Sequence, residues 1–91
     1  ELTSRPQVLF KKKPFYPRSA LRRGIEGFVR LSFTIDKNGQ IEAPIVLRAQ
    51  PSGIFDNSAL KAIKHWKFTA PKMNGHSVKV TATQTIKFTI K

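Results

Sequence analysis

The chain has 91 residues, a length that suits a single domain, and 40% of them are hydrophobic, enough to predict a packed core. It contains no cysteine, which excludes disulfides, thiol nucleophiles and cysteine-based metal sites. The 17 Lys and Arg residues against 5 Asp and Glu residues give a net charge of +12, so the surface favours anionic partners such as nucleic acid, lipid headgroups or cell-wall polymer. Because the first residue is Glu1 rather than Met, we expect a fragment of a longer protein.

Residues 1–13 are predicted to form an extended lead-in that arrives from a linker, because this stretch is rich in lysine and runs into a proline. Residues 7–10 within it are apolar enough for a short strand or for a contact with the core. Pro14 restricts the residue before it to extended geometry. A short helix is expected over residues 17–23, where Gly24 supplies the stop.

Two strands joined by a hairpin are predicted next. Residues 27–36 alternate between apolar and polar, which places one face of a strand in the core. That face consists of Val29, Leu31, Phe33 and Ile35. The Asn-Gly pair at residues 38–39 tolerates positive φ and predicts the turn. The return strand covers residues 40–50, and its apolar residues in phase are Ile41, Ala43, Ile45, Leu47 and Ala49. Pro44 cannot donate a ladder hydrogen bond, so this strand is expected at a sheet edge or with a bulge at that point.

A longer helix and a long final strand complete the prediction. The helix covers residues 54–67, and Phe55, Ala59, Ala62, Ile63 and Trp66 share one of its faces. The strand covers residues 78–90 and alternates between an apolar face and a face of threonines and lysines. The predicted order is α-β-β-α-β. The fold class is therefore α+β, a three-stranded antiparallel sheet with two helices packed on one face.

The sequence offers little for catalysis. His65 and His76 have no acidic residue or cysteine near them in the chain, and metal sites need several convergent ligands. Asp36 is explained by the hairpin turn and Asp56 by the start of a helix, so no carboxylate pair faces a common cleft. We expect no enzyme, no metal and no cofactor.

The final strand has two interpretations, which the residues alone leave open. In the first, it completes this sheet or pairs with itself in a dimer. In the second, it offers an edge to which a peptide adds as a further strand. The lysines on its polar face protect an edge, whereas the threonines do not, and no proline interrupts the run.

Several motifs in order resemble the C-terminal domain of the TonB family. They are P-F-Y-P at residues 14–17 followed by Ala20, G-I-E-G-F-V at 24–29, F-T-I-D-K-N-G at 33–39, F-D at 55–56, A-L-K-A-I-K-H-W-K-F at 59–68, and N-G at 74–75 followed by Val78 and by I-K-F at 86–88. Each motif is weak alone, but the ordered set extends from about residue 8 to the C-terminus. We assign residues 14–91 to a TonB-type C-terminal domain.

The resemblance implies a periplasmic domain at the end of an energy transducer anchored in the inner membrane by an N-terminal helix outside this chain. Such a domain binds the TonB box of outer-membrane transporters by β-strand addition and transmits energy from the proton-motive force for uptake of iron chelates, haem, nickel or cobalamin. The implied partner-binding residues are Lys13, Phe15, Tyr16, Val78, Lys79, Val80, Thr81, Ala82, Thr83, Gln84, Thr85, Ile86, Lys87, Phe88 and Thr89. Where family members carry Gln-Pro-x-Tyr, this chain has Lys13 and Phe15 around the proline.

The further partners implied by the resemblance are ExbB–ExbD, reached through the missing N-terminal segment, and peptidoglycan. We expect no nucleic-acid partner and a monomer or weak homodimer. The alternative is a basic module that binds nucleic acid or another polyanion, driven by counterion release.

Overall fold

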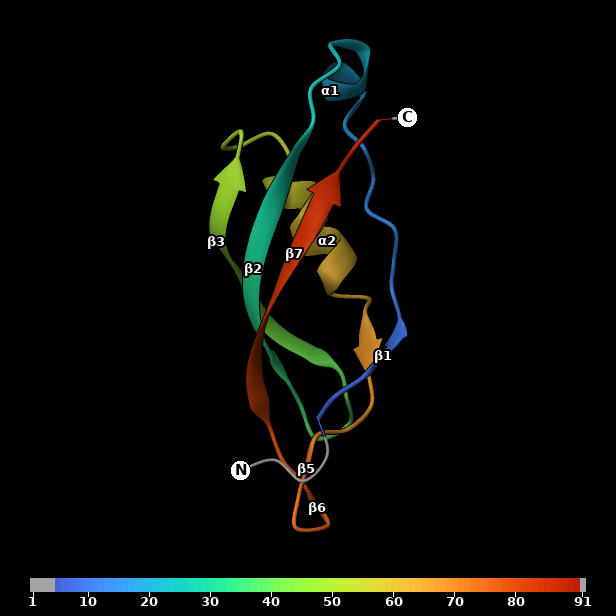
Figure 1. Ribbon diagram of the computed structural model, residues 1–91, viewed down its shortest axis with the longest axis vertical. Helices are drawn as coiled ribbons and strands as arrows, with labels where there is room; N and C mark the ends of the chain where they lie inside the picture. Colours follow the sequence, from blue (N-terminus) through green and yellow to red (C-terminus); the bar gives the residue numbers. More distant parts are fainter. Residues whose placement is uncertain (1–4, 91) are drawn as a thin grey trace.

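Three antiparallel strands in the order β3-β2-β7 form the central sheet of the computed structural model, which describes residues 5–90 (Figure 1). The strands are β2 (Gly27–Ile35), β3 (Ile41–Gln50) and β7 (Val80–Phe88). Strand β2 lies between the other two, and its apolar face is almost completely inaccessible to solvent. The buried residues of that face are Val29, Leu31, Phe33 and Ile35, as predicted from their alternation. The α+β fold class is confirmed.

Strand β3 departs from the predicted alternation. Its pairing with β2 shifts register twice, and one shift falls at Ala43 and Pro44, where Ala43 has a φ of 48°. The sheet-edge position and the bulge expected from Pro44 are both confirmed. The expected phase is wrong between the two bulges, because each bulge reverses the side-chain direction, whereas Ile41 and Ala49 pack against the core as predicted. Ile45 and Leu47 are therefore 57% and 51% exposed, and Val46 packs against the core instead.

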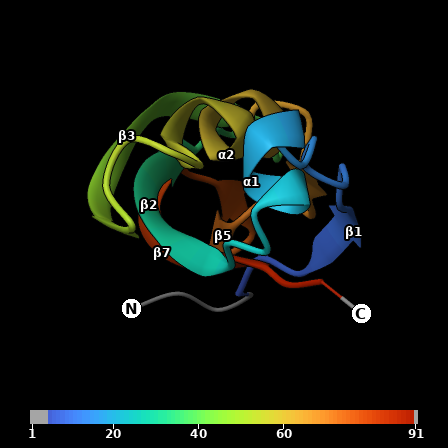
Figure 2. The ribbon, with the colours of Figure 1, turned by 90° about the horizontal axis from the view of Figure 1, so that it is seen from above.

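Both helices lie on the same side of the sheet (Figure 2). Helix α1 (Arg18–Arg22) buries Ala20, and helix α2 (Asp56–Ile63) is shorter than predicted. After it, the amides of His65 and Trp66 donate to the carbonyls three residues earlier, so the helix ends in a tighter 3₁₀-type turn. The predicted apolar face is nevertheless buried in full. It consists of Phe55, Ala59, Ala62, Ile63 and Trp66.

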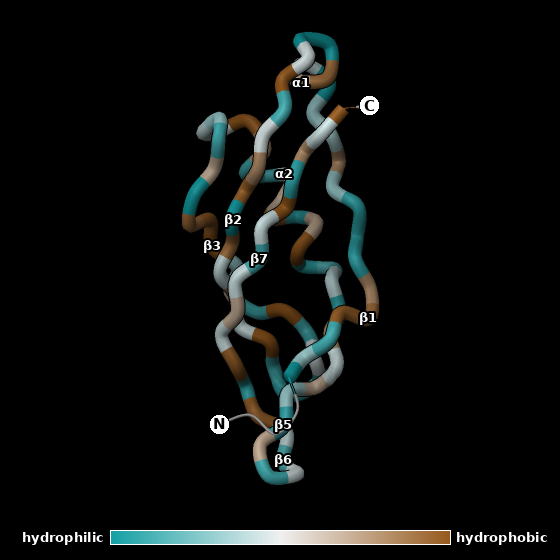
Figure 3. Tube along the Cα trace, in the orientation of Figure 1, coloured by the Kyte–Doolittle hydropathy of each residue, from teal (hydrophilic) through white to brown (hydrophobic). Residues whose placement is uncertain are grey.

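Two small ribbons accompany the sheet. Strand β1 (Val8–Phe10) pairs with β4 (Lys67–Phe68), which confirms the short strand expected in the lead-in. Strands β5 (Lys72–Met73) and β6 (His76–Ser77) form a hairpin. Figure 3 shows the hydrophobic β1 followed directly by a hydrophilic run, the lysines at residues 11–13. No helix within residues 5–90 is long and apolar enough to cross a membrane.

The turn between β2 and β3 is fixed by Asp36. Its carboxylate accepts hydrogen bonds from the amides of Asn38 and Gln40, at 2.8 and 2.9 Å. These bonds, led by that from Gln40, hold the pKa of Asp36 below its usual value despite partial desolvation. Gly39 has a φ of 83°, and a Cβ at this position would lie 1.9 Å from the carbonyl oxygen of Phe68. The turn therefore lies directly against β4.

Replacing Gly39 by alanine is expected to destabilise the fold by about 3 kcal/mol or more, because backbone must move to admit the methyl group. Gly75 is the matched control, since its φ is 82° but nothing lies within 4 Å of the added Cβ. Gly75→Ala is expected to lose only about 1 kcal/mol from the left-handed backbone. Urea unfolding of both variants measures the difference, and equal losses would contradict the close approach.

Asp36→Asn is expected to weaken the dependence of the free energy of unfolding on pH in the acid range. Because the folded pKa of Asp36 lies below the unfolded value of about 3.9, its stabilisation is complete above that value and disappears as the pH falls through the folded pKa. Urea unfolding from pH 7 into this acid range should show a steeper loss for the wild type than for the variant. Parallel curves would mean that the turn does not contribute this linkage.

Candidate functional site

Strand β7 has one edge without a strand partner among the described residues. It lies at the end of the strand order, and nine consecutive residues of β7 pair with β2 without any register shift. In an antiparallel ladder alternate residues direct their N–H and C=O groups to either side, so about half of these groups point away from β2. They form an uninterrupted row of donors and acceptors.

The opposite edge of the sheet is less suited to pairing. Strand β3 carries Pro44, which has no N–H to donate, and two register shifts that bend the strand. Such features are common at edges that proteins protect from further pairing. The sheet therefore offers one regular edge, that of β7.

The side chains of β7 follow the predicted alternation. Ile86 and Phe88 are buried on the core face, and Val80, Ala82 and Gln84 are half-buried on it. The exposed face carries Thr81, Thr83, Thr85 and Lys87.

Three residues of the predicted site flank the strand rather than belong to it. The amide of Val78 donates to the carbonyl of Pro71, at 3.0 Å, and Lys79 pairs with Glu42, at 3.1 Å. Thr89 follows the last strand residue.

The C-terminal end of β7 is held by the Gly-Ile-Glu-Gly motif. The carboxylate of Glu26 accepts a hydrogen bond from the amide of Ile90, at 2.7 Å. A Cβ at Gly27 would lie 1.9 Å from the carbonyl oxygen of Gln50, so only glycine fits between the strands there. The sequence alone does not predict this hydrogen bond of Glu26, because it joins residues 64 positions apart.

In the structure the extended lead-in continues past residue 13 up to α1, and its Tyr16 connects it to β7. Its ring meets those of Phe55 and Phe88 edge-on, with centroids 5.4 and 5.9 Å apart, and its hydroxyl donates to the carbonyl of Ile25. Partial desolvation, and to a lesser degree the negative charge of Glu26, raise the pKa of Tyr16. The hydroxyl therefore stays protonated at neutral pH and available as a donor.

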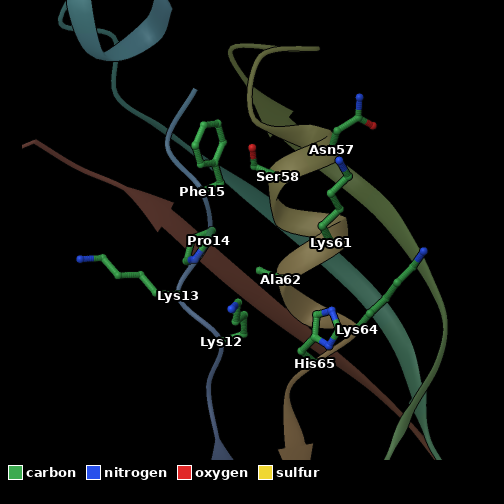
Figure 4. A pocket seen from close by; sticks show the side chains of 10 residues that line it. All are labelled: Lys12, Lys13, Pro14, Phe15, Asn57, Ser58, Lys61, Ala62, Lys64 and His65. Atoms are coloured by element: carbon green, nitrogen blue, oxygen red, sulfur yellow. The ribbon is translucent and has the colours of Figure 1, made fainter. Parts of the chain in front are cut away.

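Lys13 and Phe15 lie elsewhere, in a groove of about 550 Å³ between the lead-in and α2 (Figure 4). The lining residues are Lys12, Lys13, Pro14, Phe15, Asn57, Ser58, Lys61, Ala62, Lys64 and His65. The structure thus divides the predicted site in two, placing Tyr16 with β7 but Lys13 and Phe15 with α2. The sequence signal for this groove is Lys61 and Lys64 on α2, a pattern that does not by itself differ from that of a solvent-exposed helix face.

Both places present groups suited to binding a partner. No three His, Cys, Asp or Glu side chains converge within residues 5–90, and that part of the chain buries no charged or polar residue. What the two surfaces present is a row of backbone hydrogen-bonding groups and a set of lysine ammonium groups.

Residues 12–90 match the family model described as "Gram-negative bacterial TonB protein C-terminal". Among curated relatives, protein TonB of Pseudomonas aeruginosa is 40% identical over 78 residues, which are 86% of this chain and 23% of that protein. Protein TonB of Yersinia enterocolitica is 37% identical over 65 residues, 71% of this chain and 26% of that protein. The chain thus spans about a quarter of the length of these relatives.

Two solved structures have the same fold. The solution structure of the Pseudomonas aeruginosa TonB C-terminal domain superposes with a TM-score of 0.79 and 38% identity, over 94% of this chain and 87% of that one. The TonB2 protein of Vibrio anguillarum gives a TM-score of 0.68 and 39% identity, over 91% of this chain and 79% of that one. Sequence motifs, fold and relatives agree, and the chain belongs to the TonB C-terminal domain family.

Proposed function

We propose that this chain is the periplasmic end of a TonB energy transducer and binds the TonB box of outer-membrane transporters as a fourth strand on β7. The observation that supports this most strongly is the regular, unpartnered edge of β7, nine residues long and free of bulges and prolines. Strand addition needs such an edge, because the affinity comes from main-chain hydrogen bonds. The cargo of such transporters is an iron chelate, haem, nickel or cobalamin.

The expected interaction is weak and reversible. A peptide added along β7 forms five or six backbone hydrogen bonds, each contributing a net ~0.5–1.5 kcal/mol. Ordering a disordered peptide offsets much of this gain. The dissociation constant of an isolated TonB-box peptide is therefore expected to be on the order of micromolar or weaker.

The remainder of the proposal concerns the whole protein, of which this chain covers about a quarter in its relatives. An N-terminal helix anchors the transducer in the inner membrane and couples it to ExbB–ExbD, and peptidoglycan is a further candidate partner of the basic surface. The domain itself carries out no catalysis. In this proposal the domain holds the transporter while ExbB–ExbD exerts force on the transducer.

Two competing functions use features of the same structure. The β7 edge can pair with β7 of a second copy, giving a weak homodimer, which sedimentation at several protein concentrations would detect. The net charge of +12 favours a polyanion-binding module, whose affinity would fall steeply with salt.

N-methylation of a TonB-box peptide, one residue at a time, is expected to reduce its affinity with a period of two residues. Every second peptide N–H points toward β7, and its loss removes one backbone hydrogen bond, a decrease of about fivefold to tenfold. The intervening positions serve as matched controls and should stay within about twofold. Calorimetry at low and high salt measures each peptide.

Amide shifts of the labelled domain should cluster along β7 in the same titration and survive high salt. An affinity profile without the two-residue period would contradict strand addition. Shifts confined to lysine-rich surfaces and lost in salt would instead favour the polyanion-binding function.

Tyr16→Phe is expected to lower the free energy of unfolding by about 1 kcal/mol, because the bond to the carbonyl of Ile25 is lost. The ring stays in place, so the affinity for the TonB-box peptide should change less than about threefold. Tyr16→Ala removes the ring from Phe55 and Phe88 and should weaken both stability and binding. A normal fold with abolished binding in Tyr16→Phe would mean that the hydroxyl contacts the partner directly.

A further inference from the structure

We propose that the groove between the lead-in and α2 binds an extended acidic peptide segment of a partner protein, with carboxylates on either side of one apolar side chain. The groove shares no lining residue with β7, so this inference stands independently of strand capture. It gives a specific ligand to the lysines at residues 12 and 61, which strand addition on β7 does not use.

The wall formed by the lead-in is fixed at both ends by buried or half-buried aromatic side chains. The indole N–H of Trp66 donates to the carbonyl of Lys12, at 3.2 Å, and the ammonium of Lys11 lies 5.5 Å from the centre of the same ring. Four residues later, the hydroxyl of Tyr16 donates to the carbonyl of Ile25. The groove is therefore present before any ligand arrives, which reduces the entropy lost on binding.

The charge of the groove is positive on both walls. Lys12 comes from the lead-in and Lys61 from α2, and Figure 4 shows the side chains of Lys13 and Lys64 extending away at the rim. None of the ten lining residues is acidic. Carboxylates on a ligand would find cations on both sides, which favours an acidic segment over a neutral or basic one.

No carboxylate among residues 5–90 neutralises these lysines. The ion pair found in that part of the chain joins Lys79 to Glu42, away from the groove lining. Asp56, at the start of α2, accepts a hydrogen bond from the amide of Gly53 at 2.9 Å. The cations of the groove thus remain available to a partner.

The groove also has an apolar part. Phe15 is 71% exposed on the lead-in wall, and Pro14 and Ala62 line the same space. A volume of about 550 Å³ lies in the range of sites that enclose a few side chains. Asn57 and Ser58 supply neutral donors and acceptors suited to peptide amides. An apolar side chain flanked by acids satisfies all of these groups.

A phosphate polymer or a lipid surface fits less well. No arginine lines the groove, and arginine is the residue that recognises phosphate with two parallel hydrogen bonds. Binding of single-stranded nucleic acid combines cations with several large stacking aromatics, whereas the aromatic side chains of this groove are Phe15 and the small imidazole of His65.

The test uses the fluorescein-labelled peptide Gly-Asp-Glu-Leu-Glu-Asp-Gly and fluorescence anisotropy with the 91-residue chain. Lys12→Glu combined with Lys61→Glu should weaken binding at least about tenfold, because attraction becomes repulsion on both walls. The matched control is Lys37→Glu with Arg48→Glu, which changes the net charge equally at exposed positions outside the groove. It should change affinity less than about threefold. Equal losses in the two double variants would overturn the proposal.

The Phe15→Ala variant distinguishes binding of a peptide in the groove from binding by charge alone. It should weaken the peptide about fivefold but have no effect on a peptide with glycine in place of the central leucine, a coupling that charge alone does not produce. Tighter binding of oligo-dT or phosphatidylglycerol vesicles through the same lysines would overturn the proposal in favour of a polyanion. The TonB-box peptide should bind the Lys12→Glu, Lys61→Glu variant normally, so failure here and failure of strand capture are distinguishable.

Discussion

The stacking of Phe55 on Phe88 is the contact on which the rest of the domain depends. The centroids of the two rings lie 4.3 Å apart and the angle between the ring planes is 16°. The contact joins the start of α2 to the end of β7. A strand that leaves one edge free is held by hydrogen bonds from one side only, so its position depends strongly on what anchors its inner face. Tyr16 packs edge-on against both rings and brings the lead-in to the same point. One aromatic cluster thus positions the sheet edge, the helix and the wall of the groove.

The two edges of the sheet are built differently, and the difference has a functional meaning. Strand β3 is bent by Pro44 and by two bulges, features that discourage another chain from pairing with it. Strand β7 has neither a proline nor a bulge. If both edges were equally open, a bound peptide could join either side, and the domain could polymerise through them. The irregular β3 leaves a single direction in which the sheet can grow.

The sequence was informative wherever local patterns decide the structure. The burial of Val29 and its neighbours follows from alternation, and the edge position of β3 follows from Pro44. The phase of β3 between its two bulges could not be predicted, because a bulge is a property of two paired strands and reverses the side chains that follow it until the next bulge. The end of α2 was placed too late, since the last turn tightens where Trp66 enters the core. The groove depends on the bond between Trp66 and Lys12, 54 residues apart, which no local pattern encodes.

The anchoring of the lead-in also decides how the domain carries mechanical load. Tension applied from the N-terminal side reaches the β1–β4 pairing first, then the indole bond to Lys12, and then the hydroxyl bond from Tyr16. These attachments lie in series along the chain, so each bears the whole force in turn. A peptide added to β7, as proposed, would instead be held by several hydrogen bonds that share the force when pulled along the strand. Under such tension the lead-in is expected to detach before the sheet, whose strands are held by many hydrogen bonds in parallel.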